Sequence, residues 1–297
     1  MGEIVGVVAA VLSSALGGTT IAATRFIVGA LDPSAIGAFR FGIGFILLLP
    51  IAFAAREPWP IARDWPGVFA LGILYFGLFP LLFNWSLAFT TSARGALALS
   101  TAPLLTMVAG AGLGVEPLTT RKTVGVVIAT AGVAIALLSG LAEAPNGAWK
   151  GDLLMVAAAL CMSLYNIWSK SFIRRSAPMP YATMGMAVGG VCLTTIAWVR
   201  DAFEPVARFH SPEWLAILYL GIFGGALLFF LWAFALARST PTQVAISVTV
   251  NPIVASIVAA VLLGEQLSWN VFFGLVTVFL GIWVAMADYR AGSSGEA

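Results

Sequence analysis

Residues 102–118 read APLLTMVAGAGLGVEPL, and residues 251–267 read NPIVASIVAAVLLGEQL. The two stretches align without a gap when the second is shifted back by 149 residues. The matched positions are Pro103 with Pro252, Glu116 with Glu265, and Leu118 with Leu267. Glycine and alanine matches recur by chance in apolar sequence, whereas a proline and a glutamate kept at one offset indicate a repeat. We therefore predict that the chain contains a duplicated unit.

The same offset extends the match in both directions from this stretch. Further pairs at this spacing are Gly2 with Gly151, Ser14 with Ser163, Arg25 with Arg174, Trp65 with Trp214, Gly72 with Gly221, Gly125 with Gly274, and Gly132 with Gly281. The predicted units are residues 1–148 and 149–297, which together form one functional body.

Composition shows what surrounds these units. Hydrophobic residues make up 60% of the 297 residues and charged residues only 9%, whereas a soluble domain carries roughly 25% charged residues. Such a chain cannot form a water-facing surface, so its surroundings must be lipid. The net charge of +2 is too small and too scattered for a nucleic-acid-binding face.

A bilayer core needs roughly 20 apolar residues per helix, and charged, proline and glycine clusters divide the chain accordingly. The ten predicted spans are residues 4–25, 34–54, 66–90, 94–114, 119–139, 151–172, 180–199, 212–237, 241–263 and 268–288. All connections are short. The predicted fold class is therefore an all-α integral membrane protein with ten transmembrane helices. The first segment lacks a basic start and a cleavage site, so we expect a retained span.

The distribution of basic residues predicts the orientation, because basic loops stay on the cytoplasmic side. With the N-terminus inside, nine basic residues are cytoplasmic and five are outside. The inside set is Arg56, Arg63, Arg121, Lys122, Lys170, Arg174, Arg175, Arg238 and Arg290, and the outside set is Arg25, Arg94, Lys150, Arg200 and Arg208. Both termini are predicted to be cytoplasmic.

Each predicted unit contains five spans, which is an odd number. The second unit must then enter the membrane from the opposite side, so the two units form inverted repeats. Secondary transporters use inverted repeats for alternating access, with a substrate site near the midplane where the repeats meet. This architecture favours transport of a small solute.

The repeated motif also carries a family resemblance. Its second copy runs from Asn251-Pro252 through Gly264-Glu265-Gln266-Leu267 to a Gly274-x6-Gly281 span, and its first copy is similar except that Val115 separates Gly114 from Glu116. Over its whole length the chain resembles the EamA-type ten-span members of the drug/metabolite transporter superfamily. This resemblance implies export of amino acids and other metabolites across a bacterial-type inner (plasma) membrane, and the sequence is similar to bacterial aromatic amino-acid exporters.

The prolines and glutamates of the repeated motif each allow two interpretations. Pro103 and Pro252 lie inside predicted spans, where proline kinks a helix, and the kinks either open a central cavity or only serve packing. Glu116 and Glu265 lie at short turns, where a carboxylate favours a helix N-terminus. We expect them to be turn caps, with proton coupling as the alternative.

Charged residues within the predicted spans are few. No Asp or Glu lies in the middle of a span, so the chain lacks the buried carboxylate of proton-coupled exporters of cationic drugs. There is no cluster of buried basic residues to bind phosphate groups. Arg40 and Lys170 lie near span ends, and we expect their side chains to reach the membrane interface.

Neutral polar and aromatic residues remain as candidates for a substrate cavity. Tyr75, Phe79 and Phe83 recur at helical spacing on the third span beside Asn84. The other candidates are Tyr165, Asn166 and Trp168 on the sixth span and Asn251 on the ninth. Aromatic stripes can instead face lipid or pack, but asparagines are costly in lipid and are expected inside the bundle. Small residues of the first span, among them Ser13, Ser14, Gly17 and Thr20, allow close packing or line the cavity.

Two other functional classes compete with transport. An intramembrane enzyme needs a nucleophile with a base, or a metal cluster, among the spans, and the only histidine, His210, lies in a loop. A non-transport helical bundle remains an alternative. We predict a non-enzymatic membrane transporter, without cofactor or metal, that exports small neutral or zwitterionic metabolites. The most favoured are aromatic or large apolar amino acids, and other metabolites or drugs of the same superfamily are the alternative.

Overall fold

The computed structural model describes residues 2–90, 95, 98–137, 147–263 and 269–286. Within these ranges the regular structure is helical and contains no strand. Glu265 lies outside the described residues, as do Arg94 and Arg290.

The first half of the chain comprises seven described α-helical or π-helical elements. They are α1 (Gly2–Ile27), α2 (Pro33–Ala54), α3 (Trp65–Gly72), the π-helical segment η2 (Ile73–Leu78), α4 (Phe79–Phe89), α6 (Ala102–Gly112) and α7 (Thr120–Leu137). A 3-10 turn, η1 (Ala62–Asp64), precedes α3, and together they form one continuous helical stretch up to α4.

The described part of the second half is helical as well. Its elements are α8 (Ala148–Arg175), α9 (Pro178–Val199), α10 (Ser211–Tyr219), the π-helical segment η5 (Leu220–Leu227), α11 (Leu228–Arg238), α12 (Pro241–Ile246), the 3-10 segment η6 (Ser247–Val250), α13 (Asn251–Leu263) and α14 (Trp269–Met286). The loop before α10 holds a further 3-10 turn, η4 (Glu204–Arg208). The exposed His210 lies at the start of α10.

Local sequence explains where several helices begin. Asp32 caps α2, because its side chain accepts a hydrogen bond of 2.9 Å from the Ser34 N–H, and Pro33 occupies the first turn. Thr240 and Gln243 form a capping box around Pro241 at the start of α12. The Asp-Pro and Thr-Pro breaks in the sequence are therefore helix starts.

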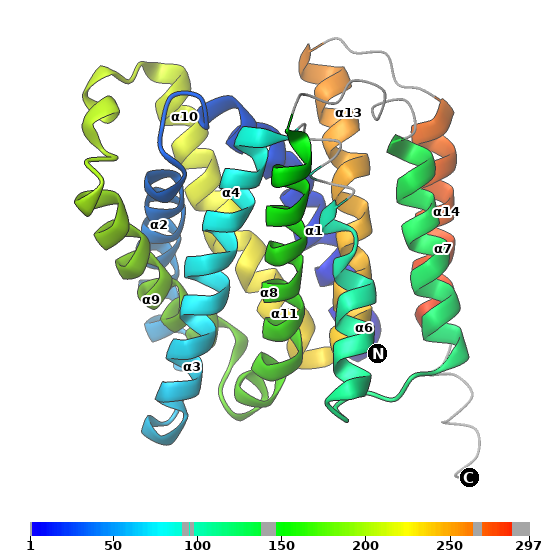
Figure 1. Ribbon diagram of the computed structural model, residues 1–297. Helices are drawn as coiled ribbons and strands as arrows, with labels where there is room; N and C mark the ends of the chain where they lie inside the picture. Colours follow the sequence, from blue (N-terminus) through cyan, green and yellow to red (C-terminus); the bar gives the residue numbers. More distant parts are fainter. Residues whose placement is uncertain (1, 91–94, 96–97, 138–146, 264–268, 287–297) are drawn as a thin grey trace.

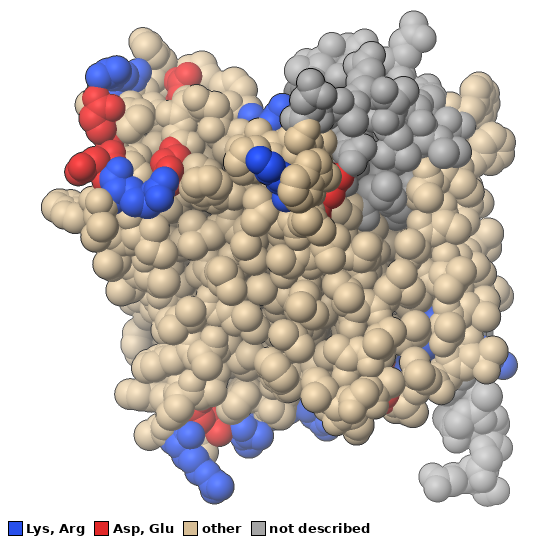
Figure 2. Space-filling model, viewed as in Figure 1, with Lys and Arg blue, Asp and Glu red and all other residues tan. Residues whose placement is uncertain are grey.

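The helices have the length and composition of membrane spans. Six helical stretches among the described residues are long and apolar enough to cross a membrane: Gly2–Ile27, Pro33–Ala54, Ala62–Phe89, Ala148–Arg175, Pro178–Val199 and Ser211–Arg238. On the face in Figure 2, charged side chains gather at the two ends and uncharged residues fill the band between them. Large apolar side chains such as Val191 and Trp283 are exposed on the surface of these helices. The chain is a multi-pass, all-α membrane protein.

Packing joins the two halves of the chain throughout the bundle. Helix α2 packs against α9, α1 against α11, and α4 against α8. Helices α7 and α14 lie side by side at one edge (Figure 1). Buried residues of α1, α2, η2, α4, α8, α9 and α11 form the main core, and this core surrounds the candidate site.

Candidate functional site

A cavity lies among the middle parts of helices from both halves of the chain. Its volume is about 50 Å³. Its lining residues are Ser13, Ser14, Gly17, Thr20, Ile21, Arg40, Tyr75, Phe79, Phe83, Leu99, Met162, Leu228, Phe229, Trp232, Val248 and Asn251. The site is thus enclosed by α1, α2, η2 and α4 from the first half and by α8, α11, η6 and α13 from the second.

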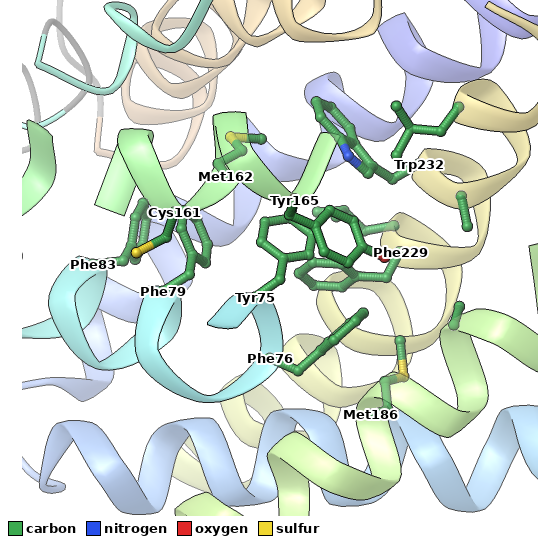
Figure 3. Packing of buried hydrophobic residues seen from close by; sticks show 14 of the residues in the cluster. Tyr75, Phe76, Phe79, Phe83, Cys161, Met162, Tyr165, Met186, Phe229 and Trp232 are labelled. Atoms are coloured by element: carbon green, nitrogen blue, oxygen red, sulfur yellow. The ribbon is translucent and has the colours of Figure 1, made fainter. Parts of the chain in front are cut away.

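Aromatic rings form one wall of the cavity. The Tyr75 ring stacks on Tyr165 with centroids 4.0 Å apart, and it meets Phe79 at 5.1 Å and Phe229 at 5.5 Å. Figure 3 shows these rings gathered together, with Trp232 nearby. Offset and edge-to-face ring pairs of this kind are favourable, so the rings form a continuous apolar wall.

The wall depends on an irregular part of the helix. Tyr75 and Phe76 belong to η2, where the backbone is π-helical, and η5 interrupts the corresponding helix of the second half in the same way. Such wide turns inside α-helices often occur at functional sites. Here η2 places Tyr75 and Phe76 against the second half of the chain, where both rings meet Phe229.

Polar groups line the opposite part of the cavity. The Ser13 hydroxyl donates to the Leu228 carbonyl at 2.7 Å, and the Ser14 hydroxyl lies 2.8 Å from that of Ser247. The Asn251 side chain lies against Gly17, where an added Cβ would be 3.1 Å from the amide nitrogen. Its Oδ1 atom has no hydrogen-bond donor among the described residues. These contacts join α1 to the second half of the chain.

Arg40 is the charged residue among the described lining residues. Its side chain is buried, its Nε donates to the Gly224 carbonyl at 2.9 Å, and its guanidinium lies 5.5 Å from the Phe229 ring. The expectation that Arg40 reaches the membrane interface is therefore wrong. Its position faces the interior of the bundle, because α2 packs on both η5 and α9.

Lys170, the other basic residue within a predicted span, has a different environment. Its ammonium donates to the Ser239 carbonyl at 2.7 Å, at the end of α11, and its side chain is half-buried. Lys170 thus joins α8 to the end of α11 and is not part of the cavity lining. The interfacial position of Lys170 stays a prediction, to which the structure adds this specific contact between helices.

Of the aromatic and asparagine candidates from the sequence, Tyr75, Phe79, Phe83 and Asn251 line the cavity; the small residues Ser13, Ser14, Gly17 and Thr20 of the first span also line it. Tyr165 lies directly behind Tyr75. Asn166 is also behind the wall, because its Oδ1 accepts a 2.9 Å hydrogen bond from the Trp232 indole. Asn84 is buried away from the lining and donates to the Pro33 carbonyl at 3.0 Å. Both asparagines are inside the bundle as expected, but they hold helices together.

Trp168 is not brought to the cavity. Its side chain is 43% exposed on the outer surface of α8, whereas Tyr165 is buried. The two residues are three positions apart on a helix, so their side chains differ in direction by about 60°. The placement of Trp168 in the cavity wall is corrected accordingly.

The two prolines of the repeated motif begin helices. Pro103 is in the first turn of α6, after a turn at Ser100 and Thr101, and Pro252 is in the first turn of α13, after the 3-10 segment η6. The expected kinks inside continuous helices are thus breaks followed by new helices, because a first-turn proline needs no intrahelical donor. One of these breaks places Asn251 at the cavity.

Glu116 lies in the turn between α6 and α7, but the helix start it contacts belongs to the other half. Its carboxylate pairs with Lys122 at 2.7 Å and accepts hydrogen bonds from the Thr242 hydroxyl at 3.0 Å and N–H at 3.3 Å, in the first turn of α12. Burial alone would raise the pKa of Glu116, but hydrogen bonds from Lys122, Thr240 and Thr242 and the charge of Lys122 outweigh it and lower the pKa. Glu116 therefore caps α12 as an ionised group.

Eight lining residues were not recognised as cavity residues from the sequence: Ile21, Arg40, Leu99, Met162, Leu228, Phe229, Trp232 and Val248. A signal for Trp232 was present, because it stands 149 residues after Phe83. Four pairs of lining residues have this separation: Ser13 with Met162, Phe79 with Leu228, Phe83 with Trp232, and Leu99 with Val248. Applying the repeat offset to the stripe on the third span would have indicated the matching residues of the eighth.

The chemistry of this lining is suited to binding. It combines an apolar aromatic wall with a few hydroxyl and amide groups and one guanidinium, a combination typical of small-molecule sites. The described lining contains no Asp, Glu, His or Cys that could act as a general base or metal ligand. The described residues as a whole hold no cluster of three or more metal-binding side chains.

Comparison with known proteins relates the chain to membrane transporters. The model of the EamA-like transporter family matches twice, over residues 4–138 and 149–287. Two Bacillus subtilis (strain 168) proteins described as uncharacterized transporters are similar. YyaM is 24% identical, covering 92% of this chain and 90% of its own. YcxC is 27% identical, covering 93% and 90%.

Another relative is described by its solute. A protein of Streptantibioticus cattleyicolor, described as a probable terminal-alkyne amino-acid exporter, is 30% identical over 69% of this chain and 68% of its own length. A crystal structure of a protein with 23% sequence identity covers 98% of both chains with a TM-score of 0.76, so the two share a fold.

Proposed function

The chain belongs to the EamA-like transporter family of the drug/metabolite transporter superfamily, and on this premise we propose that it exports small neutral or zwitterionic metabolites through the cavity between its halves. The favoured solutes are amino acids with aromatic or large apolar side chains. The observation that carries the proposal is the buried aromatic wall around Tyr75, which faces a cavity lined by both halves of the chain.

The wall fits the apolar part of such a solute. A flat ring leaving water gains from the area it buries and from ring–ring geometry with Tyr75, Phe79 and Phe229. The same cavity is lined by Ser13, Thr20 and Asn251, and the Asn251 Oδ1 atom has no hydrogen-bond donor among the described residues. The amino-acid exporter from Streptantibioticus cattleyicolor supports the choice of amino acids over other metabolites of the superfamily.

The proposed architecture is ten spans in two inverted repeats, residues 1–148 and 149–297. Support comes from the double family match and from the four lining pairs at the 149-residue offset. The π-helical segments also correspond, since Ile73–Leu78 shifted by 149 residues falls within Leu220–Leu227. Inverted repeats would expose the cavity to each side of the membrane in turn.

We place the protein in the inner (plasma) membrane with both termini in the cytoplasm, on the basis of the distribution of basic residues. Reporter fusions at the two ends test this orientation. Termini on opposite sides would contradict the even number of spans.

Flux measurements test the proposed function. Purified protein in liposomes should move radiolabelled phenylalanine, and excess unlabelled tryptophan, tyrosine or leucine should compete for it. Glutamate, lysine and glucose 6-phosphate serve as controls, because their charged parts have no place against an aromatic wall. Competition by the charged solutes alone, or phenylalanine flux equal to that of protein-free liposomes, would contradict the proposal.

A further inference from the structure

Arg40 places a positive charge in the cavity without a neutralising carboxylate among the described residues. The ion pairs there involve other basic residues: Lys122 with Glu116, Arg175 with Asp64, Arg200 with Asp32, and Arg208 with Glu204. A charge buried among membrane helices is costly unless it is paired, and an unpaired one indicates a functional site.

Most hydrogen-bond donors of Arg40 are unused as well. A guanidinium has five N–H donors, and the hydrogen bond of Arg40 within the described residues is the one from Nε to the Gly224 carbonyl. This contact fixes the plane of the group, and the Phe229 ring on one side and the Phe41 ring on another hold its position. The Nη groups therefore remain available to an acceptor in the cavity.

We propose that the Arg40 guanidinium binds a carboxylate of the transported molecule, so that the substrates are small apolar carboxylates, amino acids included. The inference rests on the proposed function, because it assigns the head group of the solute that the cavity carries. A planar guanidinium matches a carboxylate in geometry and charge. One bound carboxylate also neutralises the single charge of the lining.

The position of Phe229 connects this head-group site to the aromatic wall. Its ring lies 5.5 Å from the Arg40 guanidinium carbon and 5.5 Å from the Tyr75 ring centroid. A carboxylate bound at Arg40 thus leaves the apolar part of the same molecule within reach of Tyr75. This arrangement suits an aromatic amino acid, in which a few bonds separate the carboxylate from the ring.

Packing alone does not account for an arginine at this position. Arg40 lies against Gly224 and Gly225, where a Cβ on Gly225 would be 2.4 Å from the Arg40 carbonyl oxygen. The repeat offset relates Arg40 to Gly189 and Gly225 to Phe76. At the related contact the large and the small residue are exchanged: the glycine, Gly189, replaces the arginine, and Phe76 replaces the glycine. This contact is equally close, because a Cβ on Gly189 would be 2.3 Å from Phe76 Cβ. The same helix contact therefore forms without any charge.

The test compares two ligands that differ only at the carboxyl group. Purified full-length protein is titrated separately with L-phenylalanine and L-phenylalaninamide, and binding is measured by calorimetry, with liposome flux of each compound as a second readout. We expect the wild type to bind phenylalanine about 10- to 100-fold more tightly, because a charge-assisted hydrogen bond is lost with the amide.

Three variants assign this preference to Arg40. Arg40→Gln should bring the ratio of the two affinities close to one without weakening phenylalaninamide, and Arg40→Lys should keep part of the preference because the charge remains. Arg25→Gln is the matched control, because Arg25 is outside the cavity and donates to the Leu87 carbonyl; its ratio should equal that of the wild type. Size-exclusion profiles and melting temperatures check that each variant is folded.

The outcomes separate this inference from the proposed function. If the wild type transports both compounds equally well, or if Arg40→Gln keeps the full preference, the carboxylate site is overturned and amino-acid export stands. If the wild type moves neither compound nor any aromatic amino acid, both proposals fail. If Arg40→Gln does not fold, the wild type and Arg40→Lys decide. An affinity ratio near one in the wild type contradicts the site. A wild-type affinity ratio in Arg40→Lys, with a melting temperature for this variant that is the same at all ligand concentrations, also contradicts it.

Discussion

At the scale of single residues, small differences in position along a helix separate cavity from lipid. Tyr165 and Trp168 are three residues apart on α8, yet Tyr165 stacks on Tyr75 and Trp168 lies on the outer surface. Both rings are large and apolar, so composition cannot distinguish them. Their difference makes them a matched pair for testing the wall.

Replacing an aromatic residue of the wall should weaken solute binding. We expect Tyr75→Ala and Phe79→Ala to weaken phenylalanine binding by about 0.5 to 1.5 kcal/mol beyond the lost contact area, because each removes a ring–ring contact. Trp168→Ala is the control and should bind as the wild type does. Affinities are measured by calorimetry on folded protein. Wild-type affinity in both wall variants would mean that the solute binds elsewhere.

Glu116 gives a prediction at the same scale for the dependence of stability on pH. Its pKa is lowered in the folded state, so the ionised carboxylate stabilises the fold at pH values above its unfolded pKa, about 4.3. This stabilisation is lost as the pH falls through the lower folded pKa. Glu116→Gln removes it at every pH. The difference in melting temperature between wild type and Glu116→Gln should thus be constant near neutral pH and shrink below about pH 4.

The magnitude of the Glu116 effect follows from its buried partner. Without Glu116, the ammonium of Lys122 loses a 2.7 Å ion pair, and Thr242 loses an acceptor. A lost hydrogen bond to a charged group costs about 1.5 to 3 kcal/mol. Thr123→Val, which removes a hydroxyl bonded only to the Thr119 carbonyl in the same helix turn, is the control. An unchanged melting temperature in Glu116→Gln at pH 7 would show that the contacts of Glu116 with Lys122 and Thr242 do not stabilise the fold.

At the scale of elements, the sequence predicted the helices better than their interruptions. Apolar runs and the Asp32-Pro33 and Thr240-Pro241 breaks located the helix starts, because capping chemistry is local. The π-helical segments around Tyr75 and Phe223 had no such signal, since their wide turns depend on packing against other helices. The same holds for Arg40, whose direction depends on Gly224, a residue far away in sequence.

The contact between α7 and α14 depends on glycines of the repeated motif. A Cβ on Gly281 would lie 2.5 Å from the Ala129 backbone nitrogen, and one on Gly125 would lie 2.7 Å from the Gly281 carbonyl oxygen. Small residues allow this close approach in membranes. We expect Gly281→Ala to lower stability by about 1 to 3 kcal/mol through overpacking. The readout is the fraction of protein that survives heating, measured by size-exclusion chromatography.

Gly42→Ala is the matched control for this contact. Gly42 also lies within a helix, but a Cβ there would meet no atom within 4 Å. Its melting behaviour should stay close to that of the wild type. Equal losses in the two variants would indicate a general cost of alanine and no specific α7–α14 contact.

At the scale of the whole molecule, one asymmetric cavity is lined by two halves of the chain that each match the same family model. The related lining pairs, such as Phe83 with Trp232, supply similar apolar surface from both sides. Arg40 and Tyr75 correspond to Gly189 and Gly224 and so occur once. The proposed repeat accounts for similar surface on the two sides of the cavity, whereas its specific groups come from positions at which the halves differ.

The proposed energetics also belong to this scale. No Asp or Glu occurs in the middle of any predicted span, so no carboxylate inside a span is available to exchange a proton for the solute. Liposomes without a pH gradient should therefore still equilibrate phenylalanine. Two results together would assign proton coupling to Glu116 instead. The first is that phenylalanine flux collapses without a pH gradient, and the second is that flux no longer depends on pH in a folded Glu116→Gln variant.

The central claim is that the transported solute occupies the cavity between the halves, and substrate protection of a cysteine placed there tests it most directly. Met162→Cys is introduced after Cys161 and Cys192 are replaced by alanine, and labelling by a small thiol reagent is timed with and without phenylalanine. The account predicts that phenylalanine slows labelling at position 162 in proportion to its occupancy, and that labelling of Trp168→Cys is unaffected. Equal labelling rates at position 162 with and without saturating phenylalanine, in protein that still transports it, would contradict the claim.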